Sequence, residues 1–382
     1  MSASRFKAVI AHGGGPTAVL NSSLAGVVEA SRERFSALYA ASFGLGGILA
    51  GKMPDLLRIS PGRIAEVAQT PGSAIGSSRK KLTETEFGRI VEELRRQDIR
   101  AVFHTGGNGS MQTALDLLRH ARQARYELRV VGIPKTIDND LLVTHHAPGY
   151  ASTAYFFACA ARDAGLDCRS LPSPVCVLET LGRNAGWIVA ATSLARRHPD
   201  DPPHLIYLPE YPRSLDQIAA DVQAVHRRLG YVVLAVCEGQ RDERGTPFGA
   251  EVDRPESAVH QLASNLGHTL ARRITEQLGL RARAEKPGLV GRSCGPFARE
   301  RDRHEAFACG FAGAVAAAAG HSGVMVALDR DGGTFLTPLR TVARQERLLP
   351  LEWISESGHD VTAGFTEYAA PLVGEVPGYA RL

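Results

Sequence analysis

The alternation of short apolar runs with longer helical stretches is the feature that most constrains the fold of this chain. The short runs are rich in β-branched or aromatic residues and predict strands at residues 6–11, 101–104, 129–133, 175–178, 204–207, 232–236 and 324–328. Apolar residues return every three or four positions at 83–97, 109–124, 215–229 and 259–278, which predicts helices that cover a sheet. Strands that alternate with helices are typical of an α/β fold with mainly parallel sheets.

Length and composition set the number of domains. At roughly 150 residues per domain, 382 residues predict two or three domains, and an apolar fraction of 44% supplies their cores and excludes a disordered chain. A first border is expected near Gly149, because the first set of strands and glycine-rich loops ends there and a long helix begins. The alanine- and glycine-rich run 305–320 predicts a buried structural helix.

Charge and cysteine usage exclude several classes of protein. A formal net charge of +4 is far from the concentrated basic character of a nucleic-acid binder, so local residues must hold any anionic ligand. The six cysteines form no CxxC pair, which is typical of buried thiols in a reducing cytosol and not of a zinc site. Without a signal core or a run of about 18 apolar residues, we expect a cytoplasmic protein with no membrane span.

Two glycine-rich loops follow predicted strands. The run 13–15 comes after the first strand, with a helix expected from Thr17, and residues 106–107 end a strand before 109–110 open a helix. Bare backbone N–H groups in such loops can bind a phosphate. Neither loop has the spacing of a dinucleotide fingerprint or a P-loop, which argues against a nicotinamide dehydrogenase. A single loop of this kind is equally well explained as a structural turn.

An acidic motif follows the strand at 129–133. Lys135, Asp138 and Asp140 lie in the sequence PKTIDND, and in an extended segment the two aspartates would share a face. They could then serve as a general base and as a metal ligand or hydroxyl anchor. The alternative is a helix cap or an Asx turn. The two glycine-rich loops and this acidic motif all follow predicted strands within the first 140 residues, and together they favour a phosphate site.

The motifs together resemble the phosphofructokinase family. They are GGGPTAVLNSSLAGVV, GSAIGSSR, GGNGS, PKTIDND, LETLGRNAGW and VCEG, in the family's order over roughly residues 6–310. The resemblance implies two Rossmann-like three-layer domains with the active site in the cleft between them. The expected parts are a phosphoryl-donor domain at 1–149, a sugar-phosphate domain at 150–290, a return to the donor domain at 291–350, and a C-terminal segment at 351–382 that packs on the second domain.

The same resemblance assigns roles to single residues. Asp138 is similar to the general base that takes the proton of the attacking sugar hydroxyl, and Lys135 and Arg79 would stabilise charge on the phosphoryl groups. The implied donor-binding residues are Gly14, Gly15, Arg79, Gly107, Asn108, Gly109 and Ser110. The implied acceptor-binding residues are Thr136, Asp138, Asp140, Leu181, Gly182, Arg183, Glu238, Arg283 and Arg292. For any single arginine a solvated salt bridge is the alternative, and an arginine partner would equally satisfy Glu238.

Two positions disagree on the phosphoryl donor. Lys135 resembles the pyrophosphate-dependent members, whereas Gly109 resembles the ATP-dependent ones, because pyrophosphate enzymes often carry an aspartate there that fills nucleotide space. Asn108 stands where many members have a magnesium-binding aspartate, so Asn108 and Asp140 are the expected ligands of Mg²⁺. The sequences of the loops most resemble those of the bacterial pyrophosphate-dependent branch. We therefore favour pyrophosphate over ATP as the donor.

The expected reaction is transfer from pyrophosphate to the 1-hydroxyl of fructose 6-phosphate, a step of glycolysis and gluconeogenesis. Pro174 and Leu289 depart from the family's sugar-phosphate pattern, which keeps another sugar phosphate open as acceptor. These departures, with Asn108, also keep open a non-catalytic paralogue that binds sugar phosphate or nucleotide. The resemblance further implies a homodimer or homotetramer, and no nucleic-acid partner is expected.

Overall fold

The computed structural model describes residues 5–51, 53–172, 174–246, 248 and 265–380. The chain divides into two compact units: unit 1 comprises residues 1–150 and 293–347, and unit 2 comprises 151–292 and 348–382. Which substrate each unit binds stays a prediction. No helix in the described residues has the length and apolar character that a membrane span needs.

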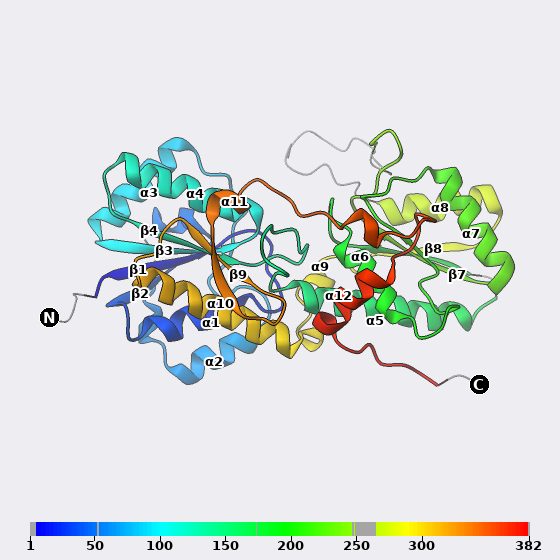
Figure 1. The fold of residues 1–382 in the computed structure, drawn as a ribbon, viewed down its shortest axis with the longest axis horizontal. Helices are drawn as coiled ribbons and strands as arrows, with labels where there is room; N and C mark the ends of the chain where they lie inside the picture. The colour runs from blue at the N-terminus through cyan, green and yellow to red at the C-terminus, as the bar shows by residue number, and fades with distance from the viewer. Residues whose placement is uncertain (1–4, 52, 173, 247, 249–264, 381–382) are drawn as a thin grey trace. The chain divides into compact units, whose positions relative to one another are not determined.

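Unit 1 is built on a six-stranded sheet in the order β10-β9-β4-β3-β1-β2 (Figure 1). Its strands are β1 (Lys7–His12), β2 (Ala37–Ala41), β3 (Ile99–Gly106), β4 (Arg129–Pro134), β9 (Val324–Leu328) and β10 (Thr334–Pro338). All neighbours pair in parallel except β9 and β10, which are antiparallel. The carboxyl ends of β1, β3 and β4 therefore meet at one edge of the sheet, where ligands bind in open α/β sheets.

Successive strand residues of unit 1 enter two separate cores. Val9 packs on the face covered by α3 (Glu84–Arg96) and α4 (Asn108–Gln123), whereas Ile10 packs on the other face. That second face is covered by α1 (Leu20–Ser31), α2 (Pro61–Gln69) and α10 (Glu300–Ala318). Short elements complete the unit: α11 (Leu339–Val342) and the 3-10 turns η1 (Leu45–Ile48), η2 (Leu56–Arg58) and η4 (Gly295–Phe297). Burial of both faces explains why the strands are continuous apolar runs.

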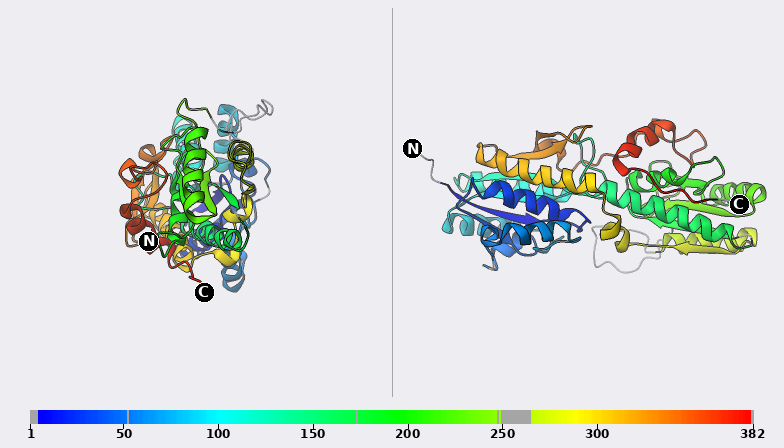
Figure 2. Two further views of the ribbon diagram at one scale, coloured as in Figure 1. Left: turned by 90° about the vertical axis from the view of Figure 1, so that its right-hand side faces the viewer. Right: turned by 90° about the horizontal axis from the view of Figure 1, so that it is seen from below.

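The alanine- and glycine-rich run at 305–320 forms most of α10, which confirms the buried helix expected there. α10 lies side by side with α1 (Figures 1 and 2). A Cβ atom on Gly310 would come within 2.0 Å of the carbonyl oxygen of Ser23, and one on Gly26 within 2.0 Å of that of Phe307. The small residues are thus required by the close approach of two helix backbones.

Unit 2 has a four-stranded parallel sheet in the order β6-β7-β5-β8. Its strands are β5 (Val175–Thr180), β6 (Leu205–Tyr207), β7 (Val232–Cys237) and β8 (Ala282–Glu285). One face packs on α7 (Leu215–Leu229) and α8 (Leu266–Leu278), and side chains of α5 (Tyr150–Arg169) pack on the other. The remaining elements are α6 (Trp187–Ala191), η3 (Thr192–Ala195), α9 (Leu289–Arg292), η5 (Leu351–Trp353) and α12 (Ala363–Val373).

The expected α/β fold with mainly parallel sheets is confirmed, with corrections at several elements. Strands β2, β8 and β10 were not predicted; β2 is rich in alanine, and β8 is a half-exposed edge strand in which charged residues alternate with alanine. α1 begins at Leu20 and not at Thr17. The helix expected at 259–278 is seen as α8, and its first part, 259–264, lies outside the described residues.

Candidate active site

The glycine run after β1 and the loop after β3 lie against each other at the carboxyl edge of the sheet in unit 1. The N–H of Gly13 donates to the carbonyl oxygen of Thr105 (2.8 Å), and a Cβ atom on Gly13 would lie 2.2 Å from Oγ of Ser110. Gly14 has a φ of +79°, a left-handed conformation that glycine adopts without strain. The loop thus folds tightly against the first turn of α4.

The segment that contains Arg79 borders the same loop. The N–H of Gly14 donates to the carbonyl oxygen of Ser78 (2.9 Å), and Oγ of Ser77 donates to the carbonyl oxygen of Gly14 (2.7 Å). Arg79 is exposed, and its guanidinium forms no hydrogen bond or ion pair within the part of the chain that the structure describes. Its donors therefore remain available to an anion.

Lys135 brings a buried positive charge to this loop. Its side chain follows β4, the residue is 3% exposed, and Nζ donates to the carbonyl oxygen of Gly15 at 2.7 Å. Burial and the charge of Lys135 lower the pKa of His12 from 6.5 to about 3 and that of His104 to about 4. Both imidazoles are therefore neutral, and they add no positive charge beside the ammonium.

Asn108 and Asp140 bring the loops after β3 and β4 together. Nδ2 of Asn108 donates to Oδ2 of Asp140 (2.8 Å) and to its carbonyl oxygen (3.2 Å). The Oδ1 atoms of both residues are buried and have no hydrogen-bond partner among the described residues. Burial, and secondarily the charge of Asp138, raises the pKa of Asp140 to about 7. Each of these two hydrogen-bonded side chains thus has a buried oxygen atom with unused lone pairs.

The segment 136–140 is not extended, so the expectation that Asp138 and Asp140 share a face by strand alternation is wrong. It forms a bend in which Asn139 has a φ of +54°, and the N–H of Asp138 donates to Oγ1 of Thr136 (3.1 Å). Asparagine tolerates the left-handed conformation better than most residues. The turn still leaves the two carboxyl groups near enough for the charge of Asp138 to raise the pKa of Asp140.

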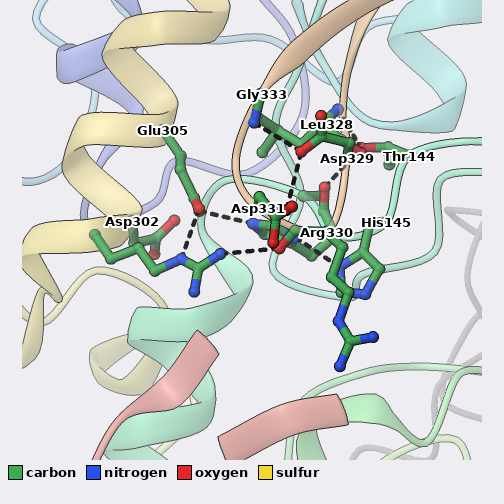
Figure 3. Close-up of polar contacts among 12 residues, drawn as sticks. Thr144, His145, Asp302, Glu305, Leu328, Asp329, Arg330, Asp331 and Gly333 are labelled. Atoms are coloured by element: carbon green, nitrogen blue, oxygen red, sulfur yellow. Dashed lines mark hydrogen bonds and ion pairs between the residues drawn. The ribbon is translucent and has the colours of Figure 1, made fainter. Parts of the chain in front are cut away.

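The far end of this loop is fixed by a polar cluster (Figure 3). The hydroxyl of Thr144 accepts from the N–H of Leu328 (2.9 Å), and the N–H of His145 donates to the carbonyl oxygen of Leu328 (2.8 Å). Nε2 of His146 lies 2.7 Å from Oε2 of Glu305, whose carboxylate also pairs with Arg301 (2.7 Å). The backbone of His145 and the imidazole of His146 thus hold the loop on β9 and α10.

Four predicted acceptor residues of unit 2 lie at the carboxyl ends of β5 and β7, namely Leu181, Gly182, Arg183 and Glu238. Arg183 has a φ of +55°, and its carbonyl oxygen would lie 1.6 Å from a Cβ atom on Gly239. Sγ of Cys237 donates to the same carbonyl oxygen (3.2 Å). Burial raises the pKa of Glu238, and the charge of Arg183 opposes that rise. The segments 181–183 and 237–239 therefore form one polar corner.

Arg283 lies apart from that corner. It sits on β8 opposite Cys176, four positions before Thr180 at the end of β5, or about 13 Å along the strand. Its exposed side chain lines a cavity of about 430 Å³ together with Arg281, Glu285 and residues of α5. Arg292 ends the short helix α9. A sugar-phosphate role for Arg283 and Arg292 stays a prediction.

Several polar residues near the loops were not singled out from the sequence. His12 directly precedes the glycine run, and that position could have drawn attention to it. Glu210 accepts from the N–H groups of Gly186 and Leu349, both at 2.8 Å, but nothing in the sequence around it signals this role. Arg347 is more than 200 positions from the loop that it contacts. Such long-range partners have no local sequence pattern.

Comparisons with known proteins found a matching family, similar sequences and similar solved structures. The family described as Phosphofructokinase matches residues 7–316. A Rhodospirillum rubrum protein named pyrophosphate–fructose 6-phosphate 1-phosphotransferase is 37% identical, over 98% of this chain and 96% of its own length. A sulfofructose kinase from Alkalicoccus urumqiensis is 32% identical over 92% of each chain. The crystal structure of a pyrophosphate-dependent phosphofructokinase from Nitrosospira multiformis superposes with a TM-score of 0.88 at 32% identity, covering 98% of this chain and 94% of that one.

Proposed function

The chain belongs to the phosphofructokinase family, and on that premise we propose that it transfers a phosphoryl group from pyrophosphate to the 1-hydroxyl of fructose 6-phosphate. The hydroxyl loses its proton to Asp138, its oxygen attacks the terminal phosphorus, and the bond to the bridging oxygen breaks. Orthophosphate leaves. Positioning and charge stabilisation supply most of the acceleration in such a reaction.

The buried ammonium of Lys135 beside the glycine loop is the observation that carries the choice of donor. A charged group with 3% exposure is costly unless acceptors or an anion surround it, and the carbonyl oxygen of Gly15, 2.7 Å from Nζ, is one such acceptor. Pyrophosphate is compact and highly charged, so its phosphates suit a point charge under bare backbone amides. Arg79, exposed at the rim, would neutralise charge on the transferred phosphoryl group.

The remaining predicted donor residues frame the same loop. Gly14 and Gly15 would offer backbone N–H groups, and the first turn of α4 would add those of Gly109 and Ser110. Gly107 precedes this turn as the N-cap of α4. Anions are stabilised at a helix N-terminus because its first N–H groups have no partner within the helix.

Asn108 and Asp140 are the residues that would hold Mg²⁺. Their Oδ1 atoms, both buried and without hydrogen-bond partners among the described residues, fit a hard cation that prefers oxygen ligands. Such an ion would neutralise phosphate charge when bound.

We assign acceptor binding to Thr136, Asp140 and the polar corner of unit 2. Glu238 is buried enough for its pKa to rise, so a hydroxyl donor of a sugar would offset its loss of hydration. Leu181, Gly182 and Arg183 would line the acceptor beside it. Arg283 and Arg292 are retained for the sugar phosphate on the strength of the family resemblance alone.

Two observations favour other substrates as second candidates. A Cβ atom on Gly109 would meet nothing within 4 Å, which leaves space for a donor larger than pyrophosphate, such as ATP. Pro174 and Leu289, together with the likeness to a sulfofructose kinase, favour a different sugar derivative as acceptor. A non-catalytic paralogue is disfavoured by the presence of both Asp138 and Lys135.

Phosphorus NMR of the purified protein tests donor and acceptor together. With pyrophosphate, Mg²⁺ and fructose 6-phosphate, we expect orthophosphate and a second sugar-phosphate resonance to grow in equal amounts. Full turnover with ATP and none with pyrophosphate would contradict the donor assignment. Turnover with neither donor, combined with a ligand-induced rise in melting temperature, would favour the non-catalytic paralogue.

A further inference from the structure

Arg347 is the last residue of unit 1 and contacts the loop that carries Asp138 and Asp140. Its guanidinium donates to the carbonyl oxygen of Asn139 through Nε (3.1 Å) and Nη2 (2.8 Å). Nη1 donates to the carbonyl oxygens of Thr144 and His145, both at 2.7 Å. The backbone N–H of Arg347 adds a bond to the carbonyl oxygen of Asp140 (2.8 Å). One residue thus binds four carbonyl groups of a single loop.

This loop has little regular structure to fix it. Residues 137–148 are all described and contain no strand or helix, and Asn139 turns the chain through a left-handed conformation. Backbone carbonyl groups outside regular structure need other donors, and a charged donor forms the stronger hydrogen bonds. Arg347 supplies these donors from a position more than 200 residues further along the chain.

The guanidinium joins two parts of the loop that differ in how they are held. Thr144 and His145 are fixed to Leu328 of β9 (Figure 3), and His146 is fixed to Glu305 of α10. The carbonyl of Asn139 lies between Asp138 and Asp140. By binding both parts, Arg347 transfers the rigidity of the anchored end to the two aspartates.

We propose that Arg347 is a positioning residue that holds Asp138 and Asp140 in their reactive geometry without touching a substrate. The inference rests on the proposed function, because it takes Asp138 as the base. Displacement of a reacting group by about 1 Å can lower a rate by about a hundredfold. Loss of this clamp, the set of hydrogen bonds from Arg347 to the loop, is therefore expected to lower kcat.

Lysine would replace the clamp only in part. Its ammonium is a single point with three donors, whereas the planar guanidinium places donors on separate edges. A lysine at position 347 can reach the carbonyl of Asn139 or those of Thr144 and His145, but not both sets at once. Arg347→Lys therefore keeps the positive charge but loses the simultaneous contact with both sets of carbonyl groups.

The test compares Arg347→Lys and Arg347→Ala with Arg340→Ala as control, since Arg340 is exposed and contacts nothing in the loop. With pyrophosphate, Mg²⁺ and fructose 6-phosphate, we expect kcat to fall about a hundredfold in Arg347→Ala, with the KM for pyrophosphate within about threefold of the original. The kcat of Arg347→Lys should lie between that of Arg347→Ala and that of the unaltered protein. The kcat of the control Arg340→Ala should equal that of the unaltered protein. Added guanidinium ion should restore part of kcat in Arg347→Ala only.

Hydrogen exchange supplies a readout that does not depend on activity. The amides of residues 140–147 should exchange faster in Arg347→Ala than in Arg340→Ala, while those of β3 are unchanged. Unaltered kcat and exchange in Arg347→Ala would overturn the inference. So would equal losses in the lysine and alanine variants without rescue by guanidinium. An unaltered protein that lacks pyrophosphate turnover would instead contradict the proposed function.

Discussion

Nζ of Lys135 lies 2.7 Å from the carbonyl oxygen of Gly15, which places a buried ammonium directly under the glycine loop of unit 1. The two residues come from the ends of β4 and β1, which are separated in the sheet by β3. Parallel pairing brings their carboxyl ends to one edge, so the contact follows from the topology. Lys135 is therefore in a position to contact an anion that binds at the glycine loop.

Replacement of Lys135 by methionine should remove the donor charge with little change in volume. We expect kcat/KM for pyrophosphate to fall about a thousandfold, because a charge-assisted contact is lost in a site that excludes water. Fructose 6-phosphate binding, measured by calorimetry, should change by less than about threefold. Lys81→Met, at an exposed position, is the matched control. Equal losses for donor and acceptor would argue against a donor-specific role.

Gly109→Asp tests the choice between donors. A side chain is accommodated there, since a Cβ atom meets nothing within 4 Å, and an acid in the first turn of α4 suits the helix dipole. Pyrophosphate turnover should stay within about threefold, while any ATP-dependent turnover falls at least tenfold. Gly109→Ala should leave turnover with either donor unchanged. Loss of pyrophosphate turnover with ATP turnover intact would reverse the assignment.

Asn108→Asp should make stability depend on Mg²⁺. In the absence of metal it places a second carboxyl group where Nδ2 of Asn108 now donates to Asp140 at 2.8 Å. The pair must then either carry two like charges or take up a proton, and we expect the fold to be destabilised by about 1–3 kcal/mol. Mg²⁺ should then raise the melting temperature of the variant more than that of the original protein. An equal rise in both proteins would indicate that the metal binds elsewhere.

His12→Gln should weaken the dependence of stability on pH. The folded protein keeps His12 neutral down to a pKa of about 3, whereas the unfolded chain takes up a proton near pH 6.5. Between those values the unfolded state binds more protons, so stability falls as the pH falls, by up to about 1.4 kcal/mol per pH unit for one such group. Urea denaturation from pH 6.5 to 4 should give a shallower slope for the variant. His268→Gln, at an exposed position, should leave the slope unchanged.

The sequence was most informative where one element determines its own ends. α7 begins at Leu215 after a capping box from Ser214 and ends at Leu229 before Gly230, whose φ is +78°, and these are the bounds predicted. β2, with the sequence ALYAA, was missed because alanine does not favour strands and the segment is recognisable only through its pairing with β1.

For the candidate site, residue types were more predictable than geometry. The glycines, Lys135 and the two aspartates stand in recognisable motifs, but the left-handed Asn139 that turns the acidic segment has no signature before the loop is folded. The clamp by Arg347 and the hydrogen bonds to Glu210 join positions far apart in the chain. Contacts of this kind depend on the complete topology, and local patterns do not specify them.

The most direct test of the account is the turnover number of Asp138→Asn with pyrophosphate, Mg²⁺ and fructose 6-phosphate. The amide has the size of the carboxyl group but cannot take the proton of the sugar hydroxyl. We predict that kcat falls by about a thousandfold or more, with both KM values within about fivefold of the original. A variant that turns over at the original rate would contradict the account, because Asp138 could then not be the base.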